Sequence, residues 1–223
     1  MPQDARARRV RRSSHPQLAV WVAIVLASLA AVALCIAFVD TAVAQSKPAW
    51  LNSIGVETIE TLSYWAGGWP LAPSLLAVAL IWAGVRWRRF LLTFAVAYLI
   101  RTAAVEGLKW LTGRPRPREM EGLTAFHGPG AGFSSFPSGH AAFGFMFAVL
   151  LSAYFPRYKM LWYAGAVVIS AARVTSDSHF VSDIVLGGLI GTLMAMLALR
   201  WWPPEAPGRA SGQAPATGAS VSS

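Results

Sequence analysis

One short stretch stands at the start of a long apolar run: Phe133-Ser134-Ser135-Phe136-Pro137-Ser138-Gly139-His140. Pro137 fits just ahead of, or in, a first helical turn, and Ser138 is a residue type that caps helix N-termini. Gly139 lets a ligand approach the backbone, where exposed N–H groups and the positive end of the helix dipole attract anions. His140 adds a side chain that can exchange a proton near neutral pH. Taken alone, the stretch is also an ordinary helix-entry turn, so its meaning depends on the rest of the chain.

The composition indicates a membrane protein. Of the 223 residues, 55% are hydrophobic and 13% are charged, and the mean hydropathy is +0.48. Charged residues make up about 25% of ordinary soluble domains. Several uncharged stretches reach the roughly 20 residues that a helix needs to cross a bilayer. Alternation typical of membrane β-barrels is absent from the sequence. We therefore predict an all-α integral membrane protein.

The net charge of +9 does not indicate nucleic-acid binding, and we expect no nucleic-acid partner. The first twelve residues contain five arginines just before an apolar segment, which is typical of a cytoplasmic flank: Arg6, Arg8, Arg9, Arg11 and Arg12. The single cysteine, Cys35, excludes an intrachain disulfide and a cysteine metal site.

Apolar segments predict six transmembrane helices, at residues 17–38, 71–85, 90–110, 137–155, 160–175 and 182–200. Three regions follow: a basic cytoplasmic flank (1–16), a membrane domain (17–202) and a disordered cytoplasmic tail rich in Pro, Ala, Gly and Ser (203–223). Residues 40–70 suit an amphipathic segment at the outer interface. The first segment could also be a signal peptide, but its apolar part is longer than about 7–15 residues, so we favour an uncleaved anchor.

Basic clusters set the orientation. Residues 86–89 and 156–159 are basic turns, which places them and both termini in the cytoplasm. The basic residues that break this rule fall on the outer side, and apart from the isolated Lys47 they are the cations that an anion site needs: Lys109, Arg114, Arg116, Arg118 and Arg173. The site therefore faces outward, and the basic, alanine-rich composition with short loops points to a bacterial inner membrane.

Three clusters come from span ends or from the loop between them, so they can converge at one level of the membrane. They are Lys109 with Arg116-Pro117, then residues 137–140, then Arg173 with His179 and Asp183. Catalysis of phosphoryl transfer is mostly positioning and stabilisation of negative charge, which a lysine and two arginines supply. Two histidines fit two roles, attack on phosphorus and protonation of the leaving oxygen. Asp183 lies one helical turn after His179 and can orient its imidazole. Nothing in this set requires a metal or another cofactor.

These motifs resemble those of the type 2 phosphatidic acid phosphatases, which share a site with vanadium haloperoxidases and glucose-6-phosphatase. The matches are Lys-x6-Arg-Pro at 109–117, Pro-Ser-Gly-His at 137–140 and Arg-x5-His-x3-Asp at 173–183. The three motifs match over residues 109–183, and the layout of the six expected spans is similar across residues 17–200. It implies a six-helix bundle, a metal-independent hydrolase, His179 as the nucleophile that becomes phosphohistidine, His140 as acid and base, and Asp183 as the orienting group. It also implies phosphate binding by Lys109, Arg116, Ser138, Gly139 and Arg173.

The chain departs from the family pattern at two places. Ala172 replaces the serine before Arg173, and Ser176-Asp177-Ser178 replaces more apolar residues before His179. Asp177 could compete with Asp183 or repel an anionic substrate. Both departures bear on rate and specificity.

The roles of other ionisable residues stay open. Arg101 and Glu106 lie inside a span, where a structural pair and a functional role are equally good interpretations. Arg114 and Arg118 suit a headgroup contact or a solvated face. His127 suits the rim of the site.

The predicted substrate is a lipid phosphate or diphosphate whose tail stays in the bilayer. Polyprenyl diphosphate, phosphatidic acid, phosphatidylglycerol phosphate and a lipid A phosphate all satisfy the pattern, which does not choose among them or set an oligomeric state. Two rival hypotheses are a phosphotransferase to an acceptor other than water, and a non-catalytic lipid transporter or binder on the same scaffold.

Overall fold

The computed structural model describes residues 14–46, 61, 87–119 and 126–204, and within them it contains helices and no strand. Two helices at the start, α2 (Ser14–Leu34) and α3 (Asp40–Gln45), are joined by one π-helical turn, η1 (Cys35–Val39). Four helices make the rest: α7 (Trp87–Thr112), α8 (Gly139–Tyr154), α9 (Lys159–Thr175) and α10 (Val181–Trp201). Short 3₁₀ turns, η2 (Pro117–Glu119) and η3 (Pro156–Tyr158), interrupt the loops.

Five of the six expected spans correspond to described helices, and the expected span at residues 71–85 lies outside the described residues. In the described part, three helical stretches are long and apolar enough to cross a membrane: Ala19–Gln45, Arg88–Glu119 and Val181–Trp201, with mean hydropathies of 2.9, 1.5 and 1.9. The apolar helix α8 is shorter, at 16 residues. The all-helical architecture is confirmed for the described residues, whereas the count of six spans stays a prediction.

The first helix runs further than expected. We predicted a span ending at residue 38 and an interfacial segment from residue 40, but the chain stays helical through η1 and α3 to Gln45. Asp40 is 1% exposed, so the start of the expected interfacial segment is buried in protein. Asp40 contacts the buried residues Arg114 and Ser182, which explains this difference. The remainder of that segment, most of residues 1–16 and most of the tail lie outside the described residues.

Glycines bring α8 and α10 into close contact. A Cβ on Gly187 would lie 2.4 Å from the carbonyl oxygen of Ser138, and one on Gly191 would lie 2.0 Å from that of Ala142. No side chain fits at either place, and small residues of this kind allow helix backbones in membranes to approach each other. The spacing Gly187-x-x-x-Gly191 is a signal that the sequence analysis did not use. The contact fixes the start of α8 against the second and third turns of α10.

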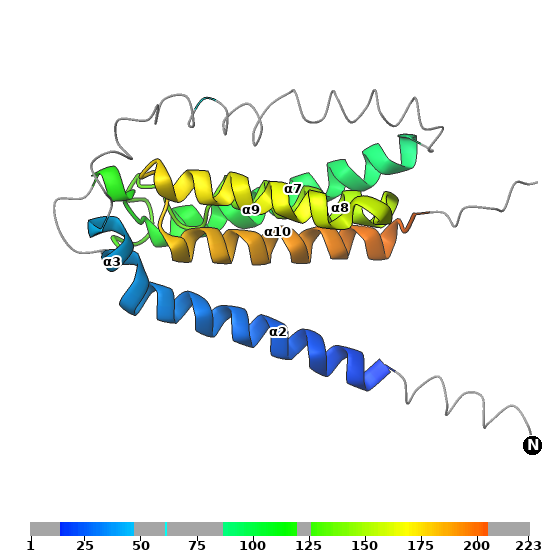
Figure 1. The fold of residues 1–223 in the computed structure, drawn as a ribbon, viewed down its shortest axis with the longest axis horizontal. Coiled ribbons are helices and arrows are strands. Elements are labelled where there is room, and N and C mark those ends of the chain that lie inside the picture. The colour runs from blue at the N-terminus through cyan, green and yellow to red at the C-terminus, as the bar shows by residue number, and fades with distance from the viewer. Residues whose placement is uncertain (1–13, 47–60, 62–86, 120–125, 205–223) are drawn as a thin grey trace, which may run out of the picture.

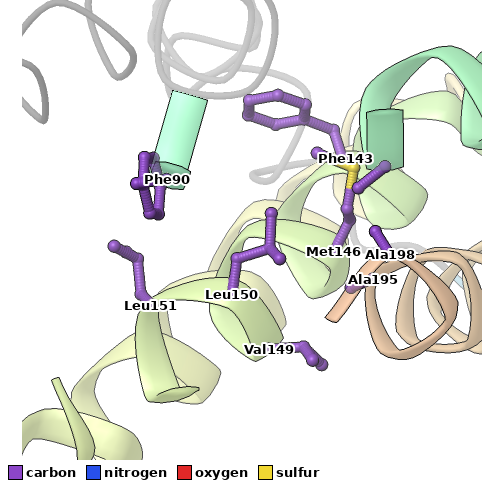
Figure 2. Packing of buried hydrophobic residues seen from close by; sticks show 9 residues of the cluster. Phe90, Phe143, Met146, Val149, Leu150, Leu151, Ala195 and Ala198 are labelled. Atoms are coloured by element: carbon purple, nitrogen blue, oxygen red, sulfur yellow. The ribbon is translucent and has the colours of Figure 1, made fainter. Parts of the chain in front are cut away.

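The core lies between α7, α8 and α10 (Figure 2). Its buried members are mostly aliphatic and aromatic: Phe90, Ala97, Phe143, Met146, Val149, Leu150, Leu151, Ala195 and Ala198. Lipid tails are as apolar as these side chains, so in a membrane close van der Waals packing, rather than removal from water, stabilises such a core. The core holds the helices together along their length and leaves the polar groups at their ends.

The polar loops gather at one end of the bundle. Figure 1 shows α3, the loop that precedes α8 and the connection between α9 and α10 at that end, while α2 diverges from the bundle toward the opposite end. The C-termini of α7 and α9 and the N-termini of α8 and α10 meet there. All three sequence motifs therefore lie at the same end of the molecule.

Candidate active site

A cavity of about 210 Å³ lies at this end of the bundle. Its lining contains six of the eight predicted site residues and three others: Lys109, Arg116, Gly139, His140, Arg173 and His179, with Tyr98, Arg101 and Ser134. The other two predicted residues, Ser138 and Asp183, are each 0% exposed and lie behind it. A larger cavity of about 430 Å³ between α2, α8, α9 and α10 is mainly apolar and contains none of these residues. The predicted site residues therefore gather at the smaller, cationic cavity.

The stretch before α8 forms a capped helix start, as expected. The helix begins at Gly139, and the hydroxyl of Ser138 accepts a hydrogen bond from the backbone N–H of Ala141 at 3.4 Å. Pro137 lies ahead of the helix, after a cis peptide bond. Gly139 and His140 line the cavity, so the positive end of the helix dipole adjoins it. The Ser138 hydroxyl serves as the cap, and its contact with phosphate stays a prediction.

His179 has one occupied ring nitrogen. Its Nδ1 lies 2.8 Å from the carbonyl oxygen of Ser135 and 3.4 Å from Oδ2 of Asp183. A carbonyl oxygen only accepts, so Nδ1 carries the proton and Nε2 keeps a free lone pair. This is the tautomer that a nucleophilic histidine needs. The sequence analysis assigned the orienting role to Asp183 and missed the nearer partner, the Ser135 carbonyl.

Asp183 is held by hydrogen bonds from several directions. Its Oδ2 accepts from the backbone N–H of Phe180 at 2.9 Å, which caps α10, and from the hydroxyl of Ser135. Its Oδ1 accepts from Nη1 of Arg114 at 2.6 Å. The carboxylate is thus fixed on the side of His179 that faces away from the cavity.

Arg114 is a buried structural residue, which corrects both interpretations that the sequence suggested. Its side chain is 0% exposed, so it neither meets solvent nor reaches a headgroup. Besides Asp183, it pairs through Nη2 with Oδ2 of Asp40 at 2.8 Å, and its guanidinium lies 4.0 Å from the ring centre of Phe180. Two carboxylates and an aromatic face offset the cost of burying the charge of Arg114.

Asp40 connects the N-terminal helices to this network. Its carboxylate accepts from the backbone N–H of Ser182 at 3.0 Å and from the hydroxyl of the same residue. Ser182 also accepts from Nη1 of Arg114 at 2.7 Å. Asp40, Arg114 and Asp183 therefore form one buried chain that ends at His179.

Cations surround the start of α8. A Cβ on Gly139 would lie 3.8 Å from Nζ of Lys109 and 4.0 Å from Nη1 of Arg101. Lys109 pairs with Glu106 at 2.8 Å, so the expected alternative of an Arg101–Glu106 pair does not form. Arg101 lines the cavity instead.

Two further cations complete the lining. Nη2 of Arg116 lies 3.4 Å from the hydroxyl of Ser134, and Arg173 is 6% exposed. Forked guanidinium donors match the oxygens of a phosphate. The lining can therefore hold an anion from several sides.

Burial lowers the pKa of His179 below its ordinary value of 6.5, and the nearby guanidinium groups of Arg173 and Arg116 act in the same direction. The hydrogen bond and the negative charge of Asp183 oppose this effect. The net direction is downward, so His179 is neutral near pH 7.

Three residues that the sequence singled out are not part of the cavity lining. His127 is exposed and its ring lies 5.0 Å from that of Phe133. Arg118 is exposed, and its backbone N–H donates to the carbonyl of Asp177 at 3.3 Å. Asp177 has a positive φ of 53°, in the turn that precedes His179. Its side chain is not among the cavity-lining groups.

Comparison with known proteins shows the family of the chain. The model of the PAP2 superfamily matches residues 86–206. A lipid A 1-phosphatase of Rhizobium etli is 34% identical over 111 residues, which cover 45% of this chain and 47% of the relative. An undecaprenyl-diphosphatase of Sulfolobus acidocaldarius is 29% identical over 118 residues, covering 52% and 56%. The chain thus spans about half the length of these curated relatives.

Two solved structures share the fold. The crystal structure of Aquifex aeolicus LpxE aligns with a TM-score of 0.53 at 22% identity, over 71% of this chain and 90% of that one. A PAP2-type phosphatidylglycerolphosphate phosphatase from Bacillus subtilis aligns with a TM-score of 0.52 at 21% identity, over 82% and 94%.

Proposed function

The chain belongs to the PAP2 superfamily, and from that premise we propose that it is a metal-independent membrane phosphatase that hydrolyses a lipid phosphate or diphosphate through a phosphohistidine. The observation that carries this proposal is the setting of His179. Its Nδ1 is occupied by Ser135 and Asp183, and it lines a cavity together with four cationic side chains and His140.

The proposed reaction has two steps. In the first, Nε2 of His179 attacks the terminal phosphorus. The bond from phosphorus to the leaving oxygen, which belongs to the lipid alcohol or to a lipid monophosphate, breaks, and His140 gives a proton to that oxygen. In the second, His140 takes a proton from water, which attacks the phosphohistidine and releases inorganic phosphate. Asp183 stabilises the positive charge on the His179 ring and keeps its tautomer.

The cations act on the transferred group. Lys109, Arg116 and Arg173 surround the equatorial oxygens, where negative charge lies in the transition state. The backbone N–H groups at Gly139 add the dipole of α8. Ser138 contributes by capping that helix, with direct phosphate contact as part of the proposal.

The substrate is proposed to be a membrane lipid with its head at the outer face of a bacterial inner membrane. Similarity to proteins named lipid A 1-phosphatase and undecaprenyl-diphosphatase supports lipid phosphates as a class. Polyprenyl diphosphate, phosphatidic acid, phosphatidylglycerol phosphate and lipid A phosphate remain the candidates. We propose the membrane domain 17–202 as the catalytic unit, with motifs in 109–183.

Phosphate release from a panel of these lipids tests the proposal. The protein is purified in detergent and assayed with EDTA present, as wild type, as His179→Ala and as His127→Ala. We expect release by the wild type and by His127→Ala, whose histidine is exposed and does not line the cavity. We expect His179→Ala to lose at least about 10³-fold, because the nucleophile is absent.

Two results would contradict the proposal. Activity lost in EDTA and restored by Mg²⁺ would exclude the metal-independent mechanism. Full activity of His179→Ala would exclude the phosphohistidine, which rapid quenching should otherwise reveal as a phosphorylated peptide containing residue 179.

A further inference from the structure

Arg101 is a buried cation that the three motifs do not include. It is 7% exposed, it lies on α7 eight residues before Lys109, and it lines the cavity. Its Nε has no hydrogen-bond partner within the described residues, and the carboxylate nearest to it in sequence, Glu106, pairs with Lys109. A buried charge is costly unless it is paired. We therefore expect a ligand in the cavity to supply negative charge to the Arg101 guanidinium.

The aromatic surroundings hold the Arg101 guanidinium in place. Its Cζ lies 4.9 Å from the ring centre of Tyr98 and 5.7 Å from that of Phe143. Aromatic faces attract a cation without supplying hydrogen-bond acceptors. These contacts position the side chain at the cavity lining and leave its Nε without a hydrogen-bond partner among the described residues.

The position of Arg101 relative to the two histidines suggests which part of a substrate it meets. Its Nη1 lies 4.0 Å from the position of a Cβ on Gly139, the residue that precedes His140. In the proposed reaction His179 attacks from one side of phosphorus, and the leaving oxygen departs in line toward His140. Nζ of Lys109 lies 3.8 Å from the same point, so Arg101 and Lys109 lie together at the start of α8. Because the motifs assign Lys109 to the transferred phosphoryl group, we assign Arg101 to the leaving group.

The charges of the cavity agree with this placement. Of the described residues that line it, four are cationic and none is acidic: Arg101, Lys109, Arg116 and Arg173. Three of these match the cations that the motifs assign to the transferred phosphoryl group. The fourth is in excess for a leaving group that is a neutral alcohol, but it suits one that carries its own negative charge.

We propose that Arg101 binds a second anionic group next to the transferred phosphoryl, so that the site selects lipid diphosphates over lipid monophosphates. This inference rests on the proposed phosphatase function. The P–O bond between the two phosphates breaks, His179 takes the terminal phosphoryl, and the lipid monophosphate leaves with the bonding electron pair on its oxygen. Arg101 offsets the negative charge that develops on that oxygen while His140 gives it a proton. His140 then takes a proton from water, which attacks the phosphohistidine and releases inorganic phosphate from His179.

The test compares farnesyl diphosphate with farnesyl monophosphate, which share one tail. The proteins are the wild type, Arg101→Gln, Arg101→Lys and the control Arg157→Gln, whose arginine is exposed in η3. We expect Arg101→Gln to lower kcat/KM about 10- to 100-fold more for the diphosphate than for the monophosphate, because a charge-assisted contact is lost. Arg101→Lys should retain part of the preference, and Arg157→Gln should match the wild type.

Equal losses on both substrates, or no loss, would overturn the role of Arg101. A second measurement needs no variant and decides the matter if Arg101→Gln does not fold. Inorganic diphosphate should inhibit the wild type at a concentration at least about 10-fold lower than orthophosphate, and equal inhibition would refute the proposal. Wild type active on both lipids without preference would refute only this inference, whereas no activity on any lipid phosphate would refute the proposed function itself.

Discussion

At the scale of single residues, the reactivity of His179 depends on what surrounds its ring. The Ser135 carbonyl and the Asp183 carboxylate occupy Nδ1, so the lone pair of Nε2 is available. Burial favours the neutral ring, while Asp183 favours the charged one. The first effect prevails, so the pKa of His179 lies below its ordinary value, which suits the role of nucleophile that we propose for it.

The pH dependence of kcat/KM should show this balance. The deprotonated imidazole is the reactive form, so a lowered pKa moves the acid limb to lower pH, and activity should persist as the pH falls through 6.5. A phosphate monoester itself ionises with a second pKa of about 6, so each rate is divided by the ionised fraction of the substrate. An acid limb that remains centred at or above 6.5 after this correction would contradict a neutral, buried His179.

At the scale of elements, the site depends on a contact between the N-terminal helices and α10. Asp40 at the start of α3 holds Arg114, which follows α7, and Ser182 in the first turn of α10. Arg114 in turn holds Asp183. The position of α3 is therefore coupled to the carboxylate that orients His179, although α3 contributes nothing to the cavity lining.

Substitution of Asp40 tests this coupling. Asp40→Asn removes one of two charges that compensate Arg114, and breaking a buried pair costs about 3–5 kcal/mol of unfolding free energy. We expect a lower thermal midpoint in detergent and a kcat reduced about 10-fold, with KM changed less than about twofold, because the phosphate-binding cations are untouched.

A matched substitution separates positioning from folding. Asp40→Glu keeps the charge and should recover part of kcat. If Asp40→Asn lowered the midpoint but left kcat unchanged, Asp40 would serve stability alone, and the proposed coupling to His179 would be wrong.

At the scale of the whole molecule, the cavity lies at one end of the bundle and the basic turn η3 lies between the other ends of α8 and α9. From the positive-inside rule we propose that η3 lies in the cytoplasm and that the cavity lies at the outer surface. A lipid in the outer leaflet could then present its head to the cavity while its tail stays in the bilayer.

Thiol labelling tests this orientation. In a Cys35→Ala background, a cysteine at the exposed position Ala131 should react with an impermeant maleimide added to right-side-out spheroplasts. A cysteine at exposed Lys159 should react only after permeabilisation. The reverse pattern would invert the proposed topology.

The spacing of the motif residues predicted which of them would come together in the fold. Because motif residues fall at helix ends, the sequence predicted that Lys109, His140 and His179 would meet, and they line one cavity. The start of α8 also followed from local rules, since capping depends on residues within one turn. Apolar segment length likewise indicated the helical membrane class.

Which face each polar residue presents was decided only by tertiary contacts. Arg114 and Arg116 lie two positions apart in the same loop, yet Arg114 is fully buried while Arg116 lines the cavity. The partners of Arg114 lie 74 and 69 positions away in the chain, beyond the reach of any local pattern. In the same way, Arg101 has no ion pair with Glu106 because Glu106 pairs with Lys109 instead. The sequence alone determined which ionisable groups the protein contains. Burial and charge pairing are set by neighbours in space, so the fold determined which of these groups line the cavity.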